Sequence, residues 1–146
     1  MRRIPSNSGW RDIITNFTKP APSPTLIAWM AEQSDDDLFI SSLTVGEVRR
    51  GVLEKPAGKR RDQLDAWFRG PQGPQALFAG RILPFDEKAG LVWAWLMAEG
   101  KAKGRPRSGL DTIIAAIAEA NDCIVVTDNE RDFEDIQVIN PIRGAT

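Results

Sequence analysis

The 146-residue sequence contains no histidine, and this absence narrows the chemistry open to it. It excludes Ser-His-Asp and Cys-His catalysis, histidine acid–base chemistry and most zinc sites. Tyrosine is absent as well. An enzyme made from this chain would therefore work with carboxylates, Lys or Arg, and a bound metal. Carboxylates are plentiful, because the chain has 20 acidic residues.

Cysteine and long apolar runs are also scarce. The single cysteine, Cys123, cannot form a disulfide framework, and we expect a reducing, cytoplasmic environment. No apolar run is long enough to span a membrane, and the N-terminus lacks the apolar core of a signal peptide. The length suits one domain, residues 1–146, with a hydrophobic core of its own.

The segment from residue 109 to 133 predicts a helix, a turn, a buried strand and an acidic loop in succession. Its first part has apolar residues at helical spacing, namely Leu110, Ile113, Ile114 and Ile117. Cys123 to Val126 has the length and composition of a central parallel strand, and the loop after it carries Asp128, Asn129 and Asp132. Sites in open α/β sheets form beyond the carboxyl ends of strands. This loop and Asp111, at the helix start, therefore suit a divalent metal.

These acidic residues also have purely structural explanations, which the sequence leaves open. Ser108 and Asp111 have the spacing of a capping box, with Ser108 as the N-cap. Asp128 and Asn129 are residue types that favour turns without any ligand.

The rest of the chain alternates helical patterns with short apolar strands. Strands are expected at 38–40, 81–83, 123–126 and 138–139, and helices after Ser23, Thr44, Gly58, Pro84 and Ser108. Thr44 and Glu47 have capping-box spacing, and residues 70–74 form a break. This alternation predicts an α/β three-layer sandwich with a mostly parallel sheet. Glu47, Asp111 and the 128–132 loop would then converge on one acidic pocket.

The net charge of −1 hides clusters of basic residues. They are Arg49 with Arg50, Lys55, residues 59–61, and Lys101, Lys103, Arg105 and Arg107. Such clusters permit nucleic-acid binding, but solvated helix faces explain them as well.

Five segments in order resemble PIN-domain ribonuclease toxins of the VapC/FitB type, from bacterial toxin–antitoxin modules. The matching segments are residues 38–51, 82–86, 110–116, 126–133 and 138–141. Each is weak alone, and their common order and spacing are specific. The resemblance covers residues 18 to 142.

This resemblance implies a metal-dependent endoribonuclease. By motif, Glu47, Asp111, Asn129 and Asp132 are the site residues, and clustered carboxylates hold Mg²⁺ or Mn²⁺. The family also implies a cognate antitoxin protein as partner, an RNA substrate and a homodimer, without membrane association.

Residues 1–17 depart from the family pattern. The family opens with a central strand that ends in Asp-Thr-Asn, and Trp10 falls where its metal-binding Asp belongs. Asp12 is the only carboxylate nearby and becomes a metal-ligand candidate if the chain shifts by two residues. Otherwise the site has lost its first ligand, and the sheet its middle strand.

Three functions therefore stay open. The chain is an active ribonuclease, or a catalytically degenerate PIN domain that binds an antitoxin, or a nuclease that acts on DNA. Four apolar residues, Trp29, Met30, Trp67 and Phe68, either line a groove for an antitoxin or pack in the core.

Overall fold

The structure is a computed structural model that describes residues 11–14, 24–107, 109–126 and 138–139. Of residues 11, 12, 24–27, 138 and 139 it describes the backbone alone. A five-stranded sheet in the order β3-β2-β1-β4-β5 forms the centre, and every strand pair is parallel. The strands are β1 (Arg11–Ile14), β2 (Leu38–Ser41), β3 (Ile82–Leu83), β4 (Cys123–Val126) and β5 (Val138–Ile139).

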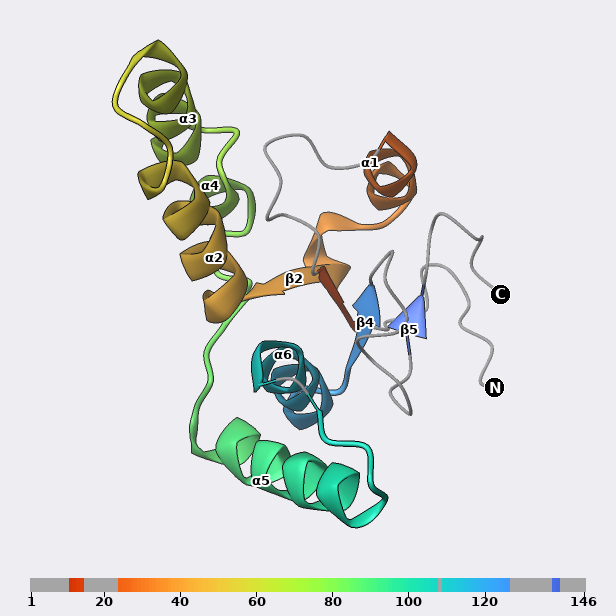
Figure 1. Ribbon diagram of the computed structural model, residues 1–146. Helices are drawn as coiled ribbons and strands as arrows, with labels where there is room; N and C mark the ends of the chain where they lie inside the picture. The colour runs from red at the N-terminus through yellow and green to blue at the C-terminus, as the bar shows by residue number, and fades with distance from the viewer. Residues whose placement is uncertain (1–10, 15–23, 108, 127–137, 140–146) are drawn as a thin grey trace.

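Helices cover both faces of this sheet (Figure 1). One face carries α1 (Pro24–Ala31), α2 (Ser42–Leu53), α3 (Lys59–Arg69) and the short α4 (Pro74–Leu77). The other carries α5 (Glu87–Ala102) and α6 (Gly109–Ala120). The predicted α/β/α sandwich is thereby confirmed. Within the described part of the chain, no helix is long and apolar enough to cross a membrane.

The middle strand of the sheet is β1, so the expectation that the divergent N-terminus removes this strand is wrong. Ile13 pairs with Phe39 of β2 on one side and with Val125 of β4 on the other. Ile13 and Ile14 are both fully buried. Two β-branched residues carry little periodicity by themselves, but pairing on both sides and burial under helices hold them in the sheet.

Successive residues of the central strands supply two separate cores. Ile13 and Val125 pack with α5 and α6, chiefly against Ala115, Ala116 and Ile117. Ile14 and Val126 pack in the other core, beneath α1, α2 and α3. Phe68 is buried in this second core, and Trp29, Met30 and Trp67 pack against it. Core packing is therefore the role the structure gives these four residues.

The start of α2 differs from the sequence-based prediction. Ser41, the last residue of β2, is the N-cap, and its Oγ accepts a hydrogen bond from the Thr44 backbone N–H at 2.9 Å. Thr44 is therefore the third helical residue, and its prediction as the cap is wrong. The buried Thr44 hydroxyl instead pairs with the Ser41 hydroxyl at 3.0 Å. The helix starts as soon as the strand ends because Ser41 satisfies the Thr44 N–H group, which has no partner within the helix.

Arg81 joins three segments of the chain through its side chain. Its guanidinium donates to the backbone carbonyls of Asp35, Leu38 at 2.7 Å and Leu77 at 2.6 Å. It also lies over the Phe78 ring, 5.4 Å from its centroid. Asp35 begins a short 3-10 helix (Asp35–Asp37), and Leu77 is the last residue of α4. This helix begins at Pro74, the last residue of the break predicted at 70–74.

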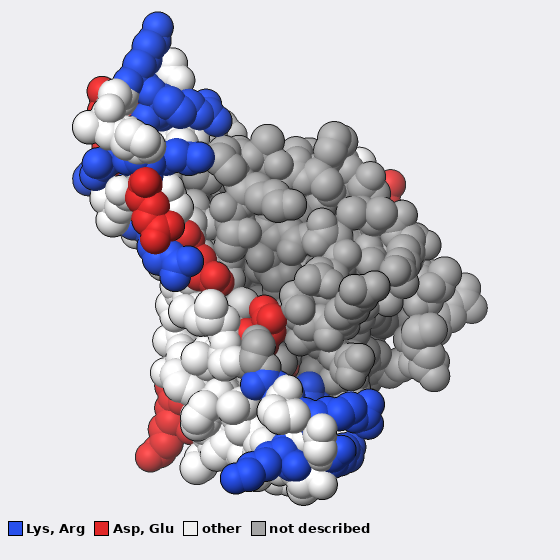
Figure 2. All heavy atoms as spheres, viewed as in Figure 1, with Lys and Arg blue, Asp and Glu red and all other residues white. Residues whose placement is uncertain are grey.

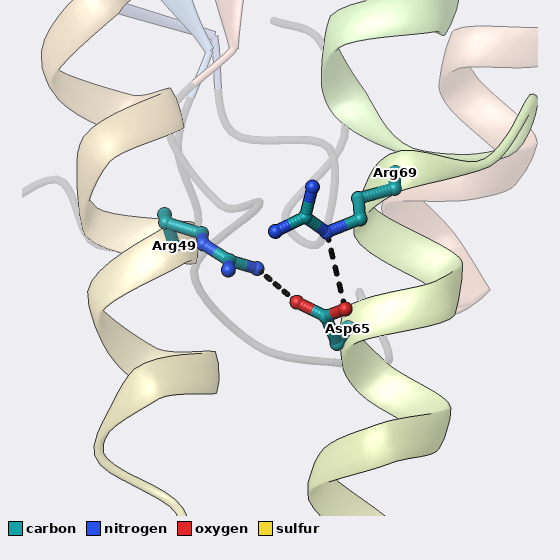
Figure 3. Close-up of polar contacts among 3 residues, drawn as sticks. All are labelled: Arg49, Asp65 and Arg69. Atoms are coloured by element: carbon teal, nitrogen blue, oxygen red, sulfur yellow. Dashed lines mark hydrogen bonds and ion pairs between the residues drawn. The ribbon is translucent and has the colours of Figure 1, made fainter.

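Asp65 of α3 ties this helix to α2 (Figure 3). The Arg49 Nη1 donates to Asp65 Oδ1 at 2.6 Å, and the Arg69 Nε donates to Asp65 Oδ2 at 3.1 Å. The Arg49 guanidinium also lies 5.1 Å from the centroid of the Phe68 ring. The Arg49 contact joins α2 to α3, and so helps to hold the helix that carries Glu47.

Candidate active site

Two carboxylates lie at the carboxyl edge of the parallel sheet. Glu47 is in the second turn of α2, which begins directly where β2 ends. Asp111 is in the first turn of α6, and α6 runs into β4 through a two-residue turn. A helix that precedes a strand and packs antiparallel to it has its first turn near the strand's carboxyl end. Both carboxylates therefore lie at the edge where ligands bind in open α/β sheets.

The charges of Glu47 and Asp111 act on each other. Partial burial raises the pKa of the Glu47 carboxyl above its usual range, and the negative charge of Asp111 raises it further. The Arg50 guanidinium, one turn along α2, lowers it in part. Neither carboxylate is fully exposed. The fold therefore holds two like charges close together, in a place where water screens them incompletely.

This pair has the donor chemistry of a Mg²⁺ or Mn²⁺ site. Carboxylate oxygens are hard ligands that suit these ions, and a divalent cation would offset the repulsion that raises the Glu47 pKa. Within the part of the chain that the structure describes, no group of three or more His, Cys, Asp or Glu residues is arranged to hold a metal. The candidate carboxylate ligands among the described residues are thus this pair.

Four residues of the predicted acidic site fall outside the described residues wholly or in part. Asn129 and Asp132 lie in the 127–137 segment, outside the described residues, as does Asp128. The backbone of Asp12 is in β1, paired with Leu38 and Ile124, and its side chain is not among those described. Of the predicted residues, then, the structure brings together Glu47 and Asp111.

Two features of the site were missed from the sequence. The buried Ser41–Thr44 pair fixes the start of α2, one turn before Glu47, and a Ser directly after an apolar strand was its signal. Arg50 follows Glu47 by three residues, a spacing that puts both on one helix face. The sequence shows this spacing, but it does not show that Arg50 lies close enough to Glu47 to lower the pKa of its carboxyl.

Comparison with known proteins shows the family of this chain. The sequence pattern of the PIN domain matches residues 13–139. The VapC ribonuclease Y4jK of Sinorhizobium fredii is 36% identical over 132 residues, 89% of this chain and 93% of that protein. Toxin FitB of Neisseria gonorrhoeae is 33% identical over 132 residues, with 89% and 94% covered.

Solved structures agree with the sequence comparison. The crystal structure of FitAcB from Neisseria gonorrhoeae superimposes with a TM-score of 0.80 at 30% identity, covering 89% of this chain and 97% of that one. FitAB bound to a DNA fragment gives a TM-score of 0.78 at 31% identity, covering 88% and 94%. The similarity therefore extends over nearly the whole length of each of these proteins.

Proposed function

This chain belongs to the PIN-domain family, among the relatives of the VapC and FitB toxins, and we propose that it is a metal-dependent endoribonuclease. The observation that carries the proposal is the pair of Glu47 and Asp111, whose charges interact across two helices at the carboxyl edge of the sheet. A structural role for Asp111 as a helix-capping residue does not require a second carboxylate beside it.

Glu47 and Asp111 would hold a Mg²⁺ or Mn²⁺ ion, with Asp132, Asn129 and Asp12 as the further site residues we propose. When bound, such an ion supplies a Lewis acid that polarises the phosphate and lowers the pKa of water. The chain's own contribution is to keep its carboxylates fixed. Ser41 caps α2, and Arg49 holds α2 to Asp65 of α3.

The proposed partners follow from the relatives. FitB is a toxin by name, and its structures are the FitAcB and FitAB complexes. We propose that this chain likewise binds a partner protein, its cognate antitoxin, and forms a homodimer. The substrate we propose is RNA, as the name VapC ribonuclease says of that relative.

The test is Mn²⁺ titration by calorimetry, followed by RNA cleavage, on the wild-type chain and Asp111→Asn. Asp62→Asn is a matched control, because Asp62 is also an acidic residue in the first turn of a helix. We expect Asp111→Asn to lose Mn²⁺ binding and cleavage with its thermal melt preserved, and Asp62→Asn to keep both. Cleavage that survives in Asp111→Asn would reject the proposed site.

The same titration on Asp12→Asn and Asp132→Asn measures the two proposed ligands whose side chains are not described. Loss of Mn²⁺ affinity in either variant, relative to Asp62→Asn, identifies that residue as a ligand. Wild-type affinity in both would confine the site to Glu47, Asp111 and main-chain or amide oxygens.

A second function, antitoxin binding without catalysis, is favoured by one observation. The resemblance implies a metal-binding Asp at the end of the central strand, whereas β1 of this chain ends in Ile13 and Ile14, both fully buried. A folded wild-type chain that binds antitoxin but neither Mn²⁺ nor RNA would establish this alternative.

A further inference from the structure

Two short segments hold much of the positive charge of this chain. Residues 55–61, the first basic patch, contain four Lys or Arg and no acidic residue, and residues 101–107, the second basic patch, contain the same. Together they hold eight of the 19 basic residues in a protein whose net charge is −1. Positive charge is therefore concentrated in these two segments and not spread evenly along the chain.

Four of these eight side chains are exposed and take part in no ion pair among the described residues, namely Lys55, Lys59, Arg60 and Lys101. Lys103 makes one weak contact, to Glu99 of the preceding turn at 3.7 Å. Salt bridges between exposed side chains contribute little, so these ammonium and guanidinium groups can exchange partners readily.

The second basic patch has a defined backbone shape. The Arg105 N–H donates to the Gly100 carbonyl at 2.8 Å, and the Gly104 N–H donates to the Lys101 carbonyl at 3.0 Å. With Gly104 at φ +70°, these bonds form a Schellman motif that reverses the chain at the end of α5. A side chain at Gly100 would come within 2.9 Å of the Arg105 carbonyl and 3.1 Å of the Arg107 Cγ. The turn is therefore packed against the helix, and the backbone that carries the basic side chains of the second patch is held in place.

The two patches lie on either side of the acidic pair. The first patch covers the far end of α2 and the start of α3, and the second covers the turn between α5 and α6. Figure 2 shows acidic side chains between these two groups of basic side chains on one face of the molecule. Along α2, Arg50 lies between Glu47 and the first patch, and along the chain Arg107 leads to Asp111. Positive charge thus approaches the acidic pair from both sides.

We propose that a single strand of RNA crosses this face, with its phosphates bound by the first and second basic patches and one phosphate over Glu47 and Asp111. The inference rests on the proposed ribonuclease function and adds how the strand is held. A strand that passes through a cleavage site continues on both sides of the cut, so contacts are needed in both directions. Basic groups on one side alone would fit a ligand that ends at the site.

Charge separates this proposal from the two simpler explanations. Solvated helix faces usually mix both signs. No acidic residue lies within residues 55–61 or 101–107, although Glu54 and Asp62 flank the first patch. An acidic protein segment would also bind Lys and Arg. Where it passes over Glu47 and Asp111, however, it would have no divalent ion to bridge it to these carboxylates, as a phosphate of RNA would. The repeated phosphates of RNA match both basic patches and the carboxylate pair.

The test is binding of a fluorescent single-stranded RNA oligonucleotide in EDTA over a range of salt concentrations. The variants are K59Q/R60Q/R61Q for the first patch and K101Q/K103Q/R105Q for the second. Each phosphate contact to a single strand contributes a slope of about 0.7 in log K against log salt. We expect each triple variant to lower the slope by about 2 and the affinity about tenfold or more at moderate salt.

A matched pair of single variants covers the case in which a triple variant does not fold. Lys88 and Lys101 are both exposed lysines of α5, at opposite ends of the helix. Lys101→Gln should weaken RNA binding and Lys88→Gln should leave it unchanged. Equal affinities and slopes for Lys88→Gln, Lys101→Gln and every folded triple variant would overturn the proposal.

Two parallel measurements separate the possible failures. Binding of poly-L-glutamate, measured in the same way, reports an acidic protein ligand. If the triple variants lose poly-L-glutamate but keep RNA, the patches serve a protein partner and the proposal is wrong. Mn²⁺ titration and cleavage of RNA by the wild type test the ribonuclease function itself, which can fail while EDTA-measured RNA binding is unaffected.

Discussion

Asp111 of α6 raises the pKa of Glu47 of α2, although the two residues are far apart in the sequence and in different helices. The sheet brings them together, because α2 follows β2, α6 precedes β4, and β1 alone separates these two strands. The pair therefore depends on the central strand, which the divergent N-terminus supplies.

Glu47→Gln is expected to stabilise the metal-free protein at neutral pH. A raised carboxyl pKa means that the folded state binds more protons than the unfolded state, between the ordinary value of 4.5 and the raised value. Wild-type stability therefore falls as the pH rises through this window, and the variant lacks that loss. Urea unfolding in EDTA at neutral pH and below pH 4.5 measures the difference, which should vanish in acid.

The control for this prediction is Glu54→Gln, which changes an exposed carboxylate at the C-cap of α2. It should change the free energy of unfolding little at either pH. A Glu47→Gln variant less stable than the wild type at neutral pH would contradict the argument.

Asp65→Asn is expected to destabilise the protein with the opposite pH dependence. The hydrogen bond from Arg49, with the further contact to Arg69, lowers the pKa of the Asp65 carboxyl below 3.8. The stabilisation is present above this ordinary value and is lost as the pH falls through the lowered pKa. Urea unfolding should show a loss at pH 7 that disappears in strong acid. Asp62→Asn, on the same helix, should be close to the wild type at both.

Arg81→Met is expected to lower the free energy of unfolding by about 1 to 3 kcal/mol, measured by urea denaturation. The change removes the charged donor for the Asp35, Leu38 and Leu77 carbonyls, and hydrogen bonds to charged groups are stronger than neutral ones. Arg81→Lys should recover only part of the loss, since an ammonium group lacks the planar fork. Lys88→Met is the control for loss of an exposed cation, and equal stability of the two Met variants would refute the role.

Two glycine variants should change stability in opposite directions. At Gly73 a Cβ would lie 2.2 Å from the Phe68 carbonyl oxygen, so Gly73→Ala must move backbone and should cost about 1 to 3 kcal/mol. At Gly90 of α5 nothing lies within 4 Å, and Gly90→Ala should stabilise by up to about 1 kcal/mol through helix propensity. Thermal melts of the two variants measure both signs, and a stable Gly73→Ala would show that the 70–73 turn can shift freely.

Several parts of the structure were predictable because their causes are local. Pro24 begins α1, Asp86 caps α5 through the Ala89 N–H at 3.0 Å, and Cys123–Val126 forms a strand, each from short-range signals in the sequence. The α/β/α class followed from the alternation of these elements. Resemblance to the family then predicted Glu47 and Asp111 as candidate site residues.

Other parts required long-range contacts. Residues 11–14 have no strong strand pattern, and they form the middle of the sheet because β2 and β4 pair with them on both sides. Ser41 displaces Thr44 as the cap of α2 because β2 ends at Ser41 itself. The partners of Arg81 and Asp65 could not be predicted, since carbonyl and side-chain positions depend on how the helices pack.

The amino-acid sequence sets which chemistry is possible: the chain has no histidine, many carboxylates, and basic residues in short clusters. It also determined the order of helices and strands, because capping, turn and periodicity signals act over a few residues. The interaction between Glu47 and Asp111 and the central place of β1 in the sheet arise from the packing of the folded chain. Electrostatic interaction depends on distance in space and on exclusion of water, and both are set by packing of segments remote in the chain.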